Sequence, residues 1–380
     1  CAFYNLPLFT SITIPKSVIS IGNYAFDNCT NLKKIIFEDD NTPIDLGYNL
    51  YNTDYYSKAQ GLFFDCTLEE IYIGRDLNYN SEKSYGYSPF NKQTKLTTLT
   101  IGDKVTSIAN YAFSDCSSLT AITIPESVTS IGNYAFSGCS SLTAITIPES
   151  VTSIGDWAFS NCSSLTAITI PKGVTSIGYF VFCDCSSLER VTINCANVGN
   201  WVSGMSSIKE IVLGESVRSI EQGAFSGCSS LESLHIGPNV DSYGSEAFAG
   251  CTAIKELTVM GNVMPEIPSE NITSITLYSP IPLETTEFAA MVYRNAMLNI
   301  PKGSLTRYQN ADVWKNFWYV NEFNPKEGKD IFLTINHADN GEVGIVVDLG
   351  RTYKVRITAF EGWKIHSVTF NGEEVTDKLT

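Results

Sequence analysis

The sequence repeats itself with a period of about 23 residues. Cys116, Cys139, Cys162 and Cys185 are evenly spaced by that interval, and the residues between them are nearly identical from one interval to the next. A unit of this length is too small to bury its own apolar residues, so neighbouring units must stack on a shared core. The sequence therefore predicts a repeat solenoid, built from contacts between adjacent units.

The cysteine position can be followed through most of the chain and predicts about thirteen units. Most steps keep the same period, but those that begin at Cys29 and Cys66 are longer and those that begin at Cys185 and Cys251 are shorter. These irregular steps are where individual features are expected. The position is held in turn by Leu6, Cys29, Cys66, Gln93, Cys116, Cys139, Cys162, Cys185, Met205, Cys228, Cys251, Ser269 and Val292.

Each unit contains one clear strand signal. The segment Leu-x-x-Ile-x-Ile, which begins at Leu119 in one copy, alternates with a period of two. Pro125 ends the pairing because it has no N–H to donate, and Gly132 allows the backbone to bend after the next apolar residues. Stacked units of this kind predict a parallel sheet on one face of the solenoid.

The chain has eleven cysteines, which could form disulfides, bind a metal or pack as free thiols in the core. Leu6, Met205 and Val292 fill the same slot in other units, so the slot requires a modest apolar side chain. We therefore predict free buried thiols, with bonding or metal binding as the alternative. Cys183 and Cys195 lie outside the regular position and are the thiols to test for reactivity.

Composition excludes several functions. The net charge of -15 argues against nucleic acid and anionic membranes as partners, and the apolar runs are too short for membrane insertion. The three histidines, His235, His337 and His366, fall on different predicted elements, and no nucleotide-binding, hydrolase or metal-helix motif is present. We therefore expect no enzyme activity, no cofactor and no metal site.

Two inserts lengthen consecutive units, after Phe37 and after Ile73. Both are predicted to leave the unit at the same point, just past the strand, and hence to emerge side by side. Tyrosine mixed with Ser, Asn and Gly provides contact area and adaptable hydrogen bonds, whereas packing of the tyrosines on the sheet edge is the alternative. The candidate binding residues are Tyr48, Tyr51, Tyr55 and Tyr56 in the first insert and Tyr79, Tyr85 and Tyr87 in the second.

His235 is the eighth candidate binding residue, because it occupies the outward-pointing middle position of a strand. That position carries threonine in most units, which suits an exposed strand surface on propensity alone. A contact surface for an extended partner is the functional alternative. The threonines are Thr13, Thr100, Thr123, Thr146, Thr169, Thr192, Thr258 and Thr276.

The repeat pattern ends near Val292. We expect residues 1–323 to form the solenoid, with a C-terminal cap over about 293–323 whose aromatic residues Trp314, Phe317 and Trp318 form its core. Residues 324–329 are predicted to be a linker, and alternating strand patterns with Asn-Gly turns predict a small, possibly truncated β-sandwich-like module over 330–380. Ala2-Phe3 matches the Ala-Phe step of the repeat, so we expect the chain to start within a unit, as a fragment of a longer protein would.

The unit CxxLxxIxIPxxVxxIGxxAFxxC resembles the BspA-type leucine-rich repeats of bacterial surface proteins over roughly residues 1 to 320. The segment IPKGSLTRYQNADVWKNF is similar to the C-terminal cap of such arrays. The resemblance implies a leucine-rich-repeat arc in a secreted or bacterial cell-surface protein that binds host matrix proteins, other bacteria or glycans. It supplies no catalytic residues.

Three functions of different classes follow. The first is a cell-surface or secreted interaction scaffold, an adhesin for an extracellular protein or glycan. The alternative is a passive structural spacer that presents another domain away from the cell, which the nearly identical units favour. An enzyme is the third, and it would require a paired-carboxylate or histidine site in a pocket near the tyrosine inserts.

Overall fold

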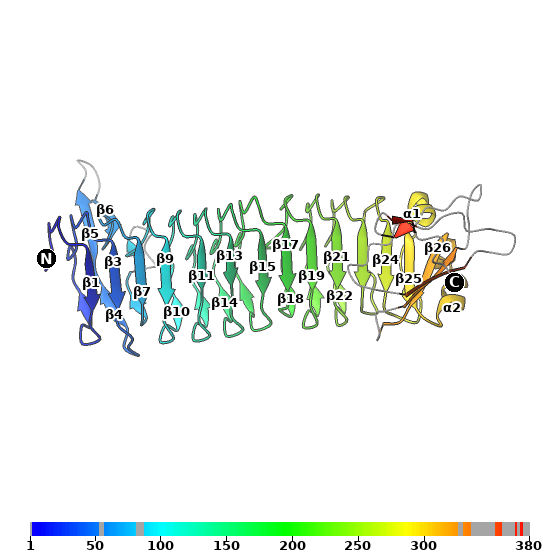
Figure 1. Ribbon diagram of the computed structural model, residues 1–380, viewed down its shortest axis with the longest axis horizontal. Helices are drawn as coiled ribbons and strands as arrows, with labels where there is room; N and C mark the ends of the chain where they lie inside the picture. Colours follow the sequence, from blue (N-terminus) through cyan, green and yellow to red (C-terminus); the bar gives the residue numbers. More distant parts are fainter. Residues whose placement is uncertain are drawn as a thin grey trace.

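A computed structural model describes residues 2–52, 57–80 and 87–325, together with four short strands further on. The solenoid is a long rod in which successive units lie side by side from the N-terminal end onward (Figure 1). Each regular unit contributes two short strands, one on each of two faces. The predicted parallel-stranded repeat solenoid of about thirteen turns is therefore confirmed.

The first strands of the units pair in parallel and in repeat register, so that Ile12 lies beside Ile35. Their hydrogen-bonded ladder is interrupted between β9 and β11 and between β13 and β15. These strands are β1 (Ser11–Ile14), β3 (Lys34–Phe37), β7 (Glu70–Ile73), β9 (Thr98–Ile101), β11 (Ala121–Thr123), β13 (Ala144–Thr146), β15 (Ala167–Ile170), β17 (Arg190–Ile193), β19 (Glu210–Leu213), β21 (Ser233–Ile236), β23 (Glu256–Val259), β24 (Ser274–Leu277), β25 (Met297–Pro301) and β26 (Tyr319–Phe323).

The second strands are mostly two residues long and also pair in parallel. They are β2 (Ser20–Ile21), β4 (Ile44–Leu46), β8 (Leu77–Asn78), β10 (Ser107–Ile108), β12 (Ser130–Ile131), β14 (Ser153–Ile154), β16 (Ser176–Ile177), β18 (Asn197–Val198), β20 (Ser219–Ile220) and β22 (Ser242–Tyr243). An antiparallel hairpin, β5 (Tyr48–Asn52) and β6 (Ser57–Gly61), projects from one long edge near the N-terminal end (Figure 1).

The core is a single column of apolar side chains that runs along the rod. Phe113, Phe136 and Phe159 are almost completely buried, and their rings stack with centroids 5.6 Å apart on both sides of Phe136. In one unit the predicted apolar set is buried throughout: Leu119, Ile122, Ile124, Val128, Ile131, Ala135, Phe136 and Cys139.

The regular cysteines form a second column beside the phenylalanines. The ten described cysteines are free, and those of the regular position are buried, which confirms the predicted thiols. The structure adds a polar role, because each thiol donates to a main-chain carbonyl of the preceding unit. Cys139 Sγ, for example, lies 3.3 Å from the Phe113 oxygen, and Cys162 Sγ lies 3.3 Å from the Phe136 oxygen.

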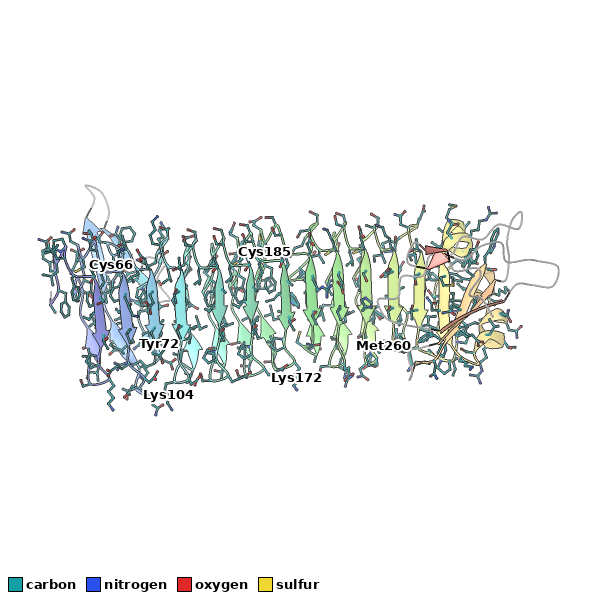
Figure 2. The ribbon with its side chains drawn as sticks, in the orientation of Figure 1. Cys66, Tyr72, Lys104, Lys172, Cys185 and Met260 are labelled. Atoms are coloured by element: carbon teal, nitrogen blue, oxygen red, sulfur yellow. The ribbon has the colours of Figure 1, made fainter. Side chains whose placement is uncertain are left out.

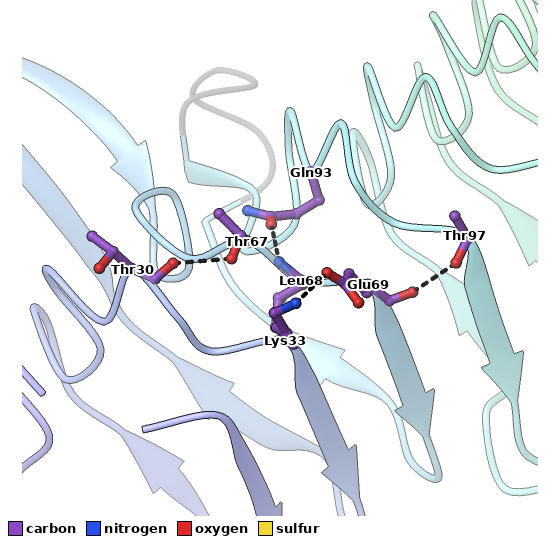
Figure 3. A network of polar contacts seen from close by, with 7 residues as sticks. All are labelled: Thr30, Lys33, Thr67, Leu68, Glu69, Gln93 and Thr97. Atoms are coloured by element: carbon purple, nitrogen blue, oxygen red, sulfur yellow. Dashed lines mark hydrogen bonds and ion pairs between the residues drawn. The ribbon is translucent and has the colours of Figure 1, made fainter. Parts of the chain in front are cut away.

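Gln93 occupies the cysteine position with a side chain that makes the same bond. Its Nε2 donates to the Phe63 carbonyl at 2.7 Å, and its Oε1 accepts from the Leu68 N–H at 3.1 Å. Leu68 follows Cys66 by two residues instead of the usual three. The amide of Gln93 therefore satisfies a donor that the shortened turn leaves without its usual partner (Figure 3).

The last units are closed by the helices α1 (Ala290–Asn295) and α2 (Leu305–Gln309) and the 3-10 helix η2 (Trp314–Asn316). Trp314 and Phe317 are buried there, as the predicted cap core requires, and the Trp314 Nε1 donates to the Leu283 carbonyl at 2.8 Å. Trp318 is half-buried, with the Arg294 guanidinium 5.2 Å from its ring.

Beyond residue 325 the structure describes β27 (Asp330–Ile335), β28 (Lys354–Thr358), β29 (Thr369–Phe370) and β30 (Glu373–Glu374). β27 pairs antiparallel with β26 and parallel with β28, and β29 pairs antiparallel with β30. The remaining residues of this stretch lie outside the described part of the chain. The predicted domain boundaries, linker and β-sandwich-like module therefore stay predictions.

Candidate functional site

The turns that contain the regular cysteines lie along one long edge of the rod, which we call the cysteine edge. Cys66 and Cys185 mark this edge in Figure 2, and Lys104 and Lys172 lie on the opposite edge. The β5–β6 hairpin projects from the cysteine edge. The inserts, the aromatic column and the groove described below all belong to this edge.

The two tyrosine-containing inserts meet at the base of the hairpin. The rings of Tyr48 and Tyr87 lie edge to face, with centroids 4.7 Å apart. Tyr79 is half-buried, and its hydroxyl donates to the Asn110 carbonyl at 2.8 Å, which anchors the second insert to a neighbouring unit. Burial raises the pKa of the Tyr79 hydroxyl. A binding role for these three tyrosines stays a prediction.

The other insert tyrosines can be placed only in part. Tyr51 lies on β5, whereas Tyr55, Tyr56 and Tyr85 fall outside the described residues. The insertion point differs from the expected one. Residues 44–46 form β4, the regular second strand of their unit, so most of the extra chain of the first insert follows β4 and does not follow β3 directly.

His235 lies on β21 in the row of outward-pointing strand residues, between Val212 of β19 and Thr258 of β23. Its side chain is half-buried, and its Nε2 lies 3.1 Å from Ser233 Oγ. Its neighbours in the row are one apolar residue and one threonine, so no cluster of ionisable groups forms around it in the described part of that row. Its binding role also stays a prediction.

A column of four rings on the cysteine edge is a feature that the sequence analysis missed. Tyr111, Tyr134, Trp157 and Phe180 each lie five residues before a regular cysteine, and we call them the turn stack. Their neighbouring ring centroids are 4.9, 6.0 and 4.6 Å apart, and the planes are nearly parallel. The spacing could have been read from the sequence, because the same position is aromatic in four consecutive units.

The turn stack is held in a strained backbone conformation. All four residues have positive φ angles, between 56° and 59°. Bulky side chains rarely adopt this region, and each such residue costs about 1–2 kcal/mol. The equivalent residue two units further on is Gly223, at φ 64°, which has no such cost. The chain therefore carries aromatic side chains at positions where glycine is conformationally better.

The turn stack ends at Phe180, because the turn of the next unit has a different length and sequence. A row of side-chain oxygens runs beside the stack, with Asn133 Oδ1 accepting from the Asp156 N–H at 2.8 Å and Asp156 Oδ1 accepting from the Tyr179 N–H at 2.8 Å. Tyr179 has no such oxygen to offer the next unit. Tyr179 and Phe180 are exposed, at 71% and 56%.

The next turn is one residue shorter than its predecessor. The chain has one residue fewer between Val198 and Met205 than between Ile177 and Cys185, although the isoleucine and valine positions are equivalent. Asn200 falls at the position of the stack, so no ring of the described residues covers the outer face of Phe180. The usual Ala-Phe pair is replaced by Trp201 and Val202.

A groove of about 690 Å³ opens at this shortened turn, and we call it the short-unit groove. Trp201 lies at its base with 8% of its surface exposed. Polar lining residues include serines of both turns. The lining residues used below are Tyr179, Phe180, Cys183, Asp184, Asn200 and Trp201.

Main-chain hydrogen bonds between neighbouring turns are lost at the groove. In the preceding unit the N–H groups of Trp157, Phe159 and Asn161 donate to carbonyls of the next turn at 2.9, 3.0 and 2.8 Å. The equivalent N–H groups belong to Phe180, Phe182 and Asp184, and among the described residues they make no such bond. The groove is therefore bordered by a set of main-chain donors that the next unit does not satisfy.

Cys183 is the described cysteine that is not buried, and it lines this groove. Partial burial and the adjacent Asp184 carboxylate, whose Oδ2 is 3.5 Å from the Cys183 Sγ, raise the pKa of its thiol. Cys195, the other irregular cysteine, is buried, and burial raises its pKa to about 11. Within the described residues no group of three or more His, Cys, Asp or Glu side chains is arranged to hold a metal ion.

The stacked parallel strands and the cysteine-containing turns define a leucine-rich-repeat solenoid. The family model of the BspA type leucine rich repeat region matches the chain in six copies, over residues 1–89, 83–202 and 197–296. The chain therefore belongs to the BspA-type leucine-rich-repeat family. No helix in the described part of the chain is both long and apolar enough to span a membrane.

Several solved structures resemble the chain. A leucine-rich repeat protein from Bacteroides ovatus is 22% identical, with 83% of each chain covered and a TM-score of 0.44. A leucine rich cell surface protein from Faecalibacterium prausnitzii is 25% identical, with 77% of this chain and 73% of that chain covered and a TM-score of 0.34. The pneumococcal vaccine antigen PcpA is 21% identical, with coverage of 83% and 78% and a TM-score of 0.35. The comparison with curated proteins gave no match.

Proposed function

We propose that this chain is an extracellular interaction scaffold, a bacterial adhesin that binds host matrix proteins, other bacteria or glycans through its cysteine edge. Membership of the BspA-type family supports a surface or secreted location and a binding role. The side chains gathered at this edge are rings, amides and hydroxyls, which are suited to contact more than to catalysis. The proposed function is therefore binding of a partner and not catalysis.

One observation carries the proposal: the chain holds four aromatic side chains at strained positive φ angles on one edge. Backbone strain that brings no burial is typical of functional positions, because packing does not repay it. Trp157 and Tyr134 are only half-buried, whereas the parallel phenylalanine column supplies the buried contacts. The turn stack is thus better explained by contact with a partner than by stability of the core.

The insert hairpin belongs to the same edge as the stack. Asn49, a buried residue of β5, accepts a hydrogen bond from the Tyr24 N–H at 3.1 Å, and Asn23 accepts one from the Tyr48 N–H at 3.0 Å. Tyr24 occupies the position of the stack residues and also has a positive φ, of 59°. The hairpin and the stack thus extend one contact surface along several units.

The test is a binding screen of the chain against extracellular matrix proteins and a glycan array, with a variant that shortens the hairpin. Deletion of residues 41–58 would remove the buried residues Ile44 and Leu46, so a smaller change is required. Replacement of residues 51–58 by Asn-Gly keeps the Leu50–Ala59 pair and closes it with a two-residue turn. The bond from Asn49 to the neighbouring unit is retained.

We expect saturable binding that the hairpin variant weakens and that a control with Lys104→Ala and Lys172→Ala on the opposite edge retains. Equal binding by the hairpin variant would exclude Tyr51, Tyr55 and Tyr56 as the site. If neither protein binds any matrix protein or glycan, the passive spacer becomes the better description of the solenoid.

A further inference from the structure

We propose that the short-unit groove is a binding subsite for one neutral pyranose sugar, which stacks on the open face of Phe180. The inference rests on the proposed binding function and names a ligand class and a location for it. It does not involve the tyrosine inserts, which lie several units away along the rod.

The first argument is the open ring face. In the turn stack, Tyr134 and Trp157 have rings on both sides at 4.6 to 6.0 Å, whereas Phe180, among the described residues, has a stacked ring only on the side of Trp157. Phe180 lines the groove and is 56% exposed. One face of a pyranose carries several C–H groups and packs well on an aromatic ring. A sugar would thus take the place of the next member of the column.

The second argument is the set of unused main-chain donors. The N–H groups of Phe180 and Asp184 lack the bonds that their equivalents make in the preceding unit, because the shortened turn does not reach them. Phe180 and Asp184 are exposed, so these N–H groups are accessible to a ligand, whose acceptor oxygens would replace water as their partners. Sugar hydroxyls accept as well as donate, and they can pair with these donors and with the Asn200 amide and Asp184 carboxylate.

The third argument is charge. Among the described residues that line the groove, Asp184 is the only charged one, and no Lys, Arg or His is present. With a chain charge of -15, the site offers nothing to balance a carboxylate, sulfate or phosphate. These observations favour a neutral sugar and disfavour uronic acids, sialic acids and sulfated glycans.

Size and composition favour a sugar over an aromatic side chain of a partner protein. The volume of about 690 Å³ is within the usual range of small-molecule sites, and such sites combine a ring surface with a few placed polar groups. An aromatic side chain would also stack on Phe180, but it carries fewer hydroxyl groups than a sugar to pair with the N–H groups and the Asp184 carboxylate.

The test measures binding of methyl glycosides of glucose, galactose, mannose and N-acetylglucosamine to the whole chain by saturation-transfer NMR and calorimetry. Glucuronic acid serves as the anionic probe and N-acetyltyrosinamide as the aromatic one. The variants are Phe180→Gly, which matches native Gly223 in the same strained position, and Asp184→Asn, which matches Asn161 at φ 57°. Lys172→Ala changes a side chain of the same unit on the opposite edge of the rod and is the matched control.

We expect at least one neutral glycoside to bind saturably and to slow alkylation of Cys183. Phe180→Gly and Asp184→Asn should each weaken that binding by about tenfold or more, while Lys172→Ala leaves it unchanged. Thermal unfolding of each variant checks that it is folded. The proposal is overturned if no neutral glycoside binds, if Phe180→Gly binds as well as the parent, or if glucuronic acid or N-acetyltyrosinamide binds more tightly than every neutral sugar.

These outcomes are separable from those of the hairpin test. Loss of sugar binding in Phe180→Gly, with matrix or glycan binding retained, assigns the two activities to different parts of the cysteine edge. A screen without any hairpin-dependent binding removes residues 51–58 as a site but does not change the result at the groove. A groove without sugar binding leaves the broader scaffold proposal untouched.

Discussion

Replacement of two rings in one unit tests whether the turn stack serves stability or binding. Phe136 is completely buried between two phenylalanines, and Tyr134, two residues earlier, is half-buried between Tyr111 and Trp157. The stacking geometries are similar, with nearly parallel planes in both columns. If ring stacking itself stabilised the solenoid, the two losses would be comparable, whereas burial predicts that they differ.

The magnitudes follow from burial and backbone strain. Phe136→Ala removes a fully buried ring and should cost about 3–5 kcal/mol of unfolding free energy. Tyr134→Gly loses two exposed ring contacts of about 0.5–1.5 kcal/mol each, and it gains about 1–2 kcal/mol because glycine tolerates its φ of 56°. The net change for Tyr134→Gly therefore lies between a gain of about 1 kcal/mol and a loss of about 2 kcal/mol, below the cost of Phe136→Ala.

Hydrogen exchange measured by mass spectrometry suits this comparison, because a solenoid can open locally around a weakened unit. Phe136→Ala should increase exchange in its own unit and in the two adjacent units, and Tyr134→Gly should increase it much less. Equal destabilisation by both variants would refute the reasoning. The turn stack would then be a structural element, and its strain would no longer argue for a partner.

Three further predictions concern single side chains. Burial and a neighbouring carboxylate raise the pKa of Asp27 from 3.8 to about 6, so its contribution to stability is greatest below pH 3.8 and is lost as the pH rises through 6. Asp27→Asn should accordingly raise the melting temperature at pH 7.5 and not at pH 3.5, and an equal gain at both values would contradict this. In the native protein, maleimide should label Cys183 before Cys139, whose pKa burial raises to about 12, and peptide mapping that finds equal rates would show that the turns open readily. Gln93→Leu should cost about 1–3 kcal/mol in urea unfolding, because it leaves the Leu68 N–H unpaired, whereas unchanged stability would show that another group satisfies that donor.

The repeat made the fold predictable from the sequence. Apolar residues such as Leu119 and Phe136 recur at fixed positions, and a stack of identical units has only one way to bury them together. The burial of Trp314 and Phe317 was predictable for a related reason, since both follow the point where the repeat pattern ends and the core of the last units needs a cover. The polar role of the thiols was not, because a sulfur-to-carbonyl bond depends on the exact offset between neighbouring turns.

The position of the first insert was harder to predict. Counting from one cysteine to the next measures how many residues are added but not where in the unit they lie. Ile44 and Leu46 alternate with Asp45 and are buried, which identifies them as the regular second strand. That alternation is visible in the sequence, and it would have moved the insert past β4 to the cysteine edge.

The short-unit groove could not be derived from sequence spacing alone, although the shorter step from Cys185 to Met205 marks its unit. Spacing does not say whether a shortened unit is closed by its neighbours or left open. The backbone conformation determines whether the unit stays open. The missing residue falls in the turn, so the carbonyls that would accept from the Phe180 and Asp184 N–H groups are no longer within reach. The open ring face follows from the same loss, since Asn200 replaces the next aromatic residue.

A repetitive array and a unique site are therefore compatible in one chain. Regular units satisfy one another, because their rings stack and their thiols and main-chain donors bond to carbonyls of a neighbouring unit. Among the described residues, one residue fewer in a single turn leaves a ring face open at Phe180 and removes several bonds from main-chain donors to the next unit, between Phe180 and Asp184. Specific binding to a solenoid is most readily created at such an interruption, since the unsatisfied groups already exist and are held rigidly by the stacked units on either side.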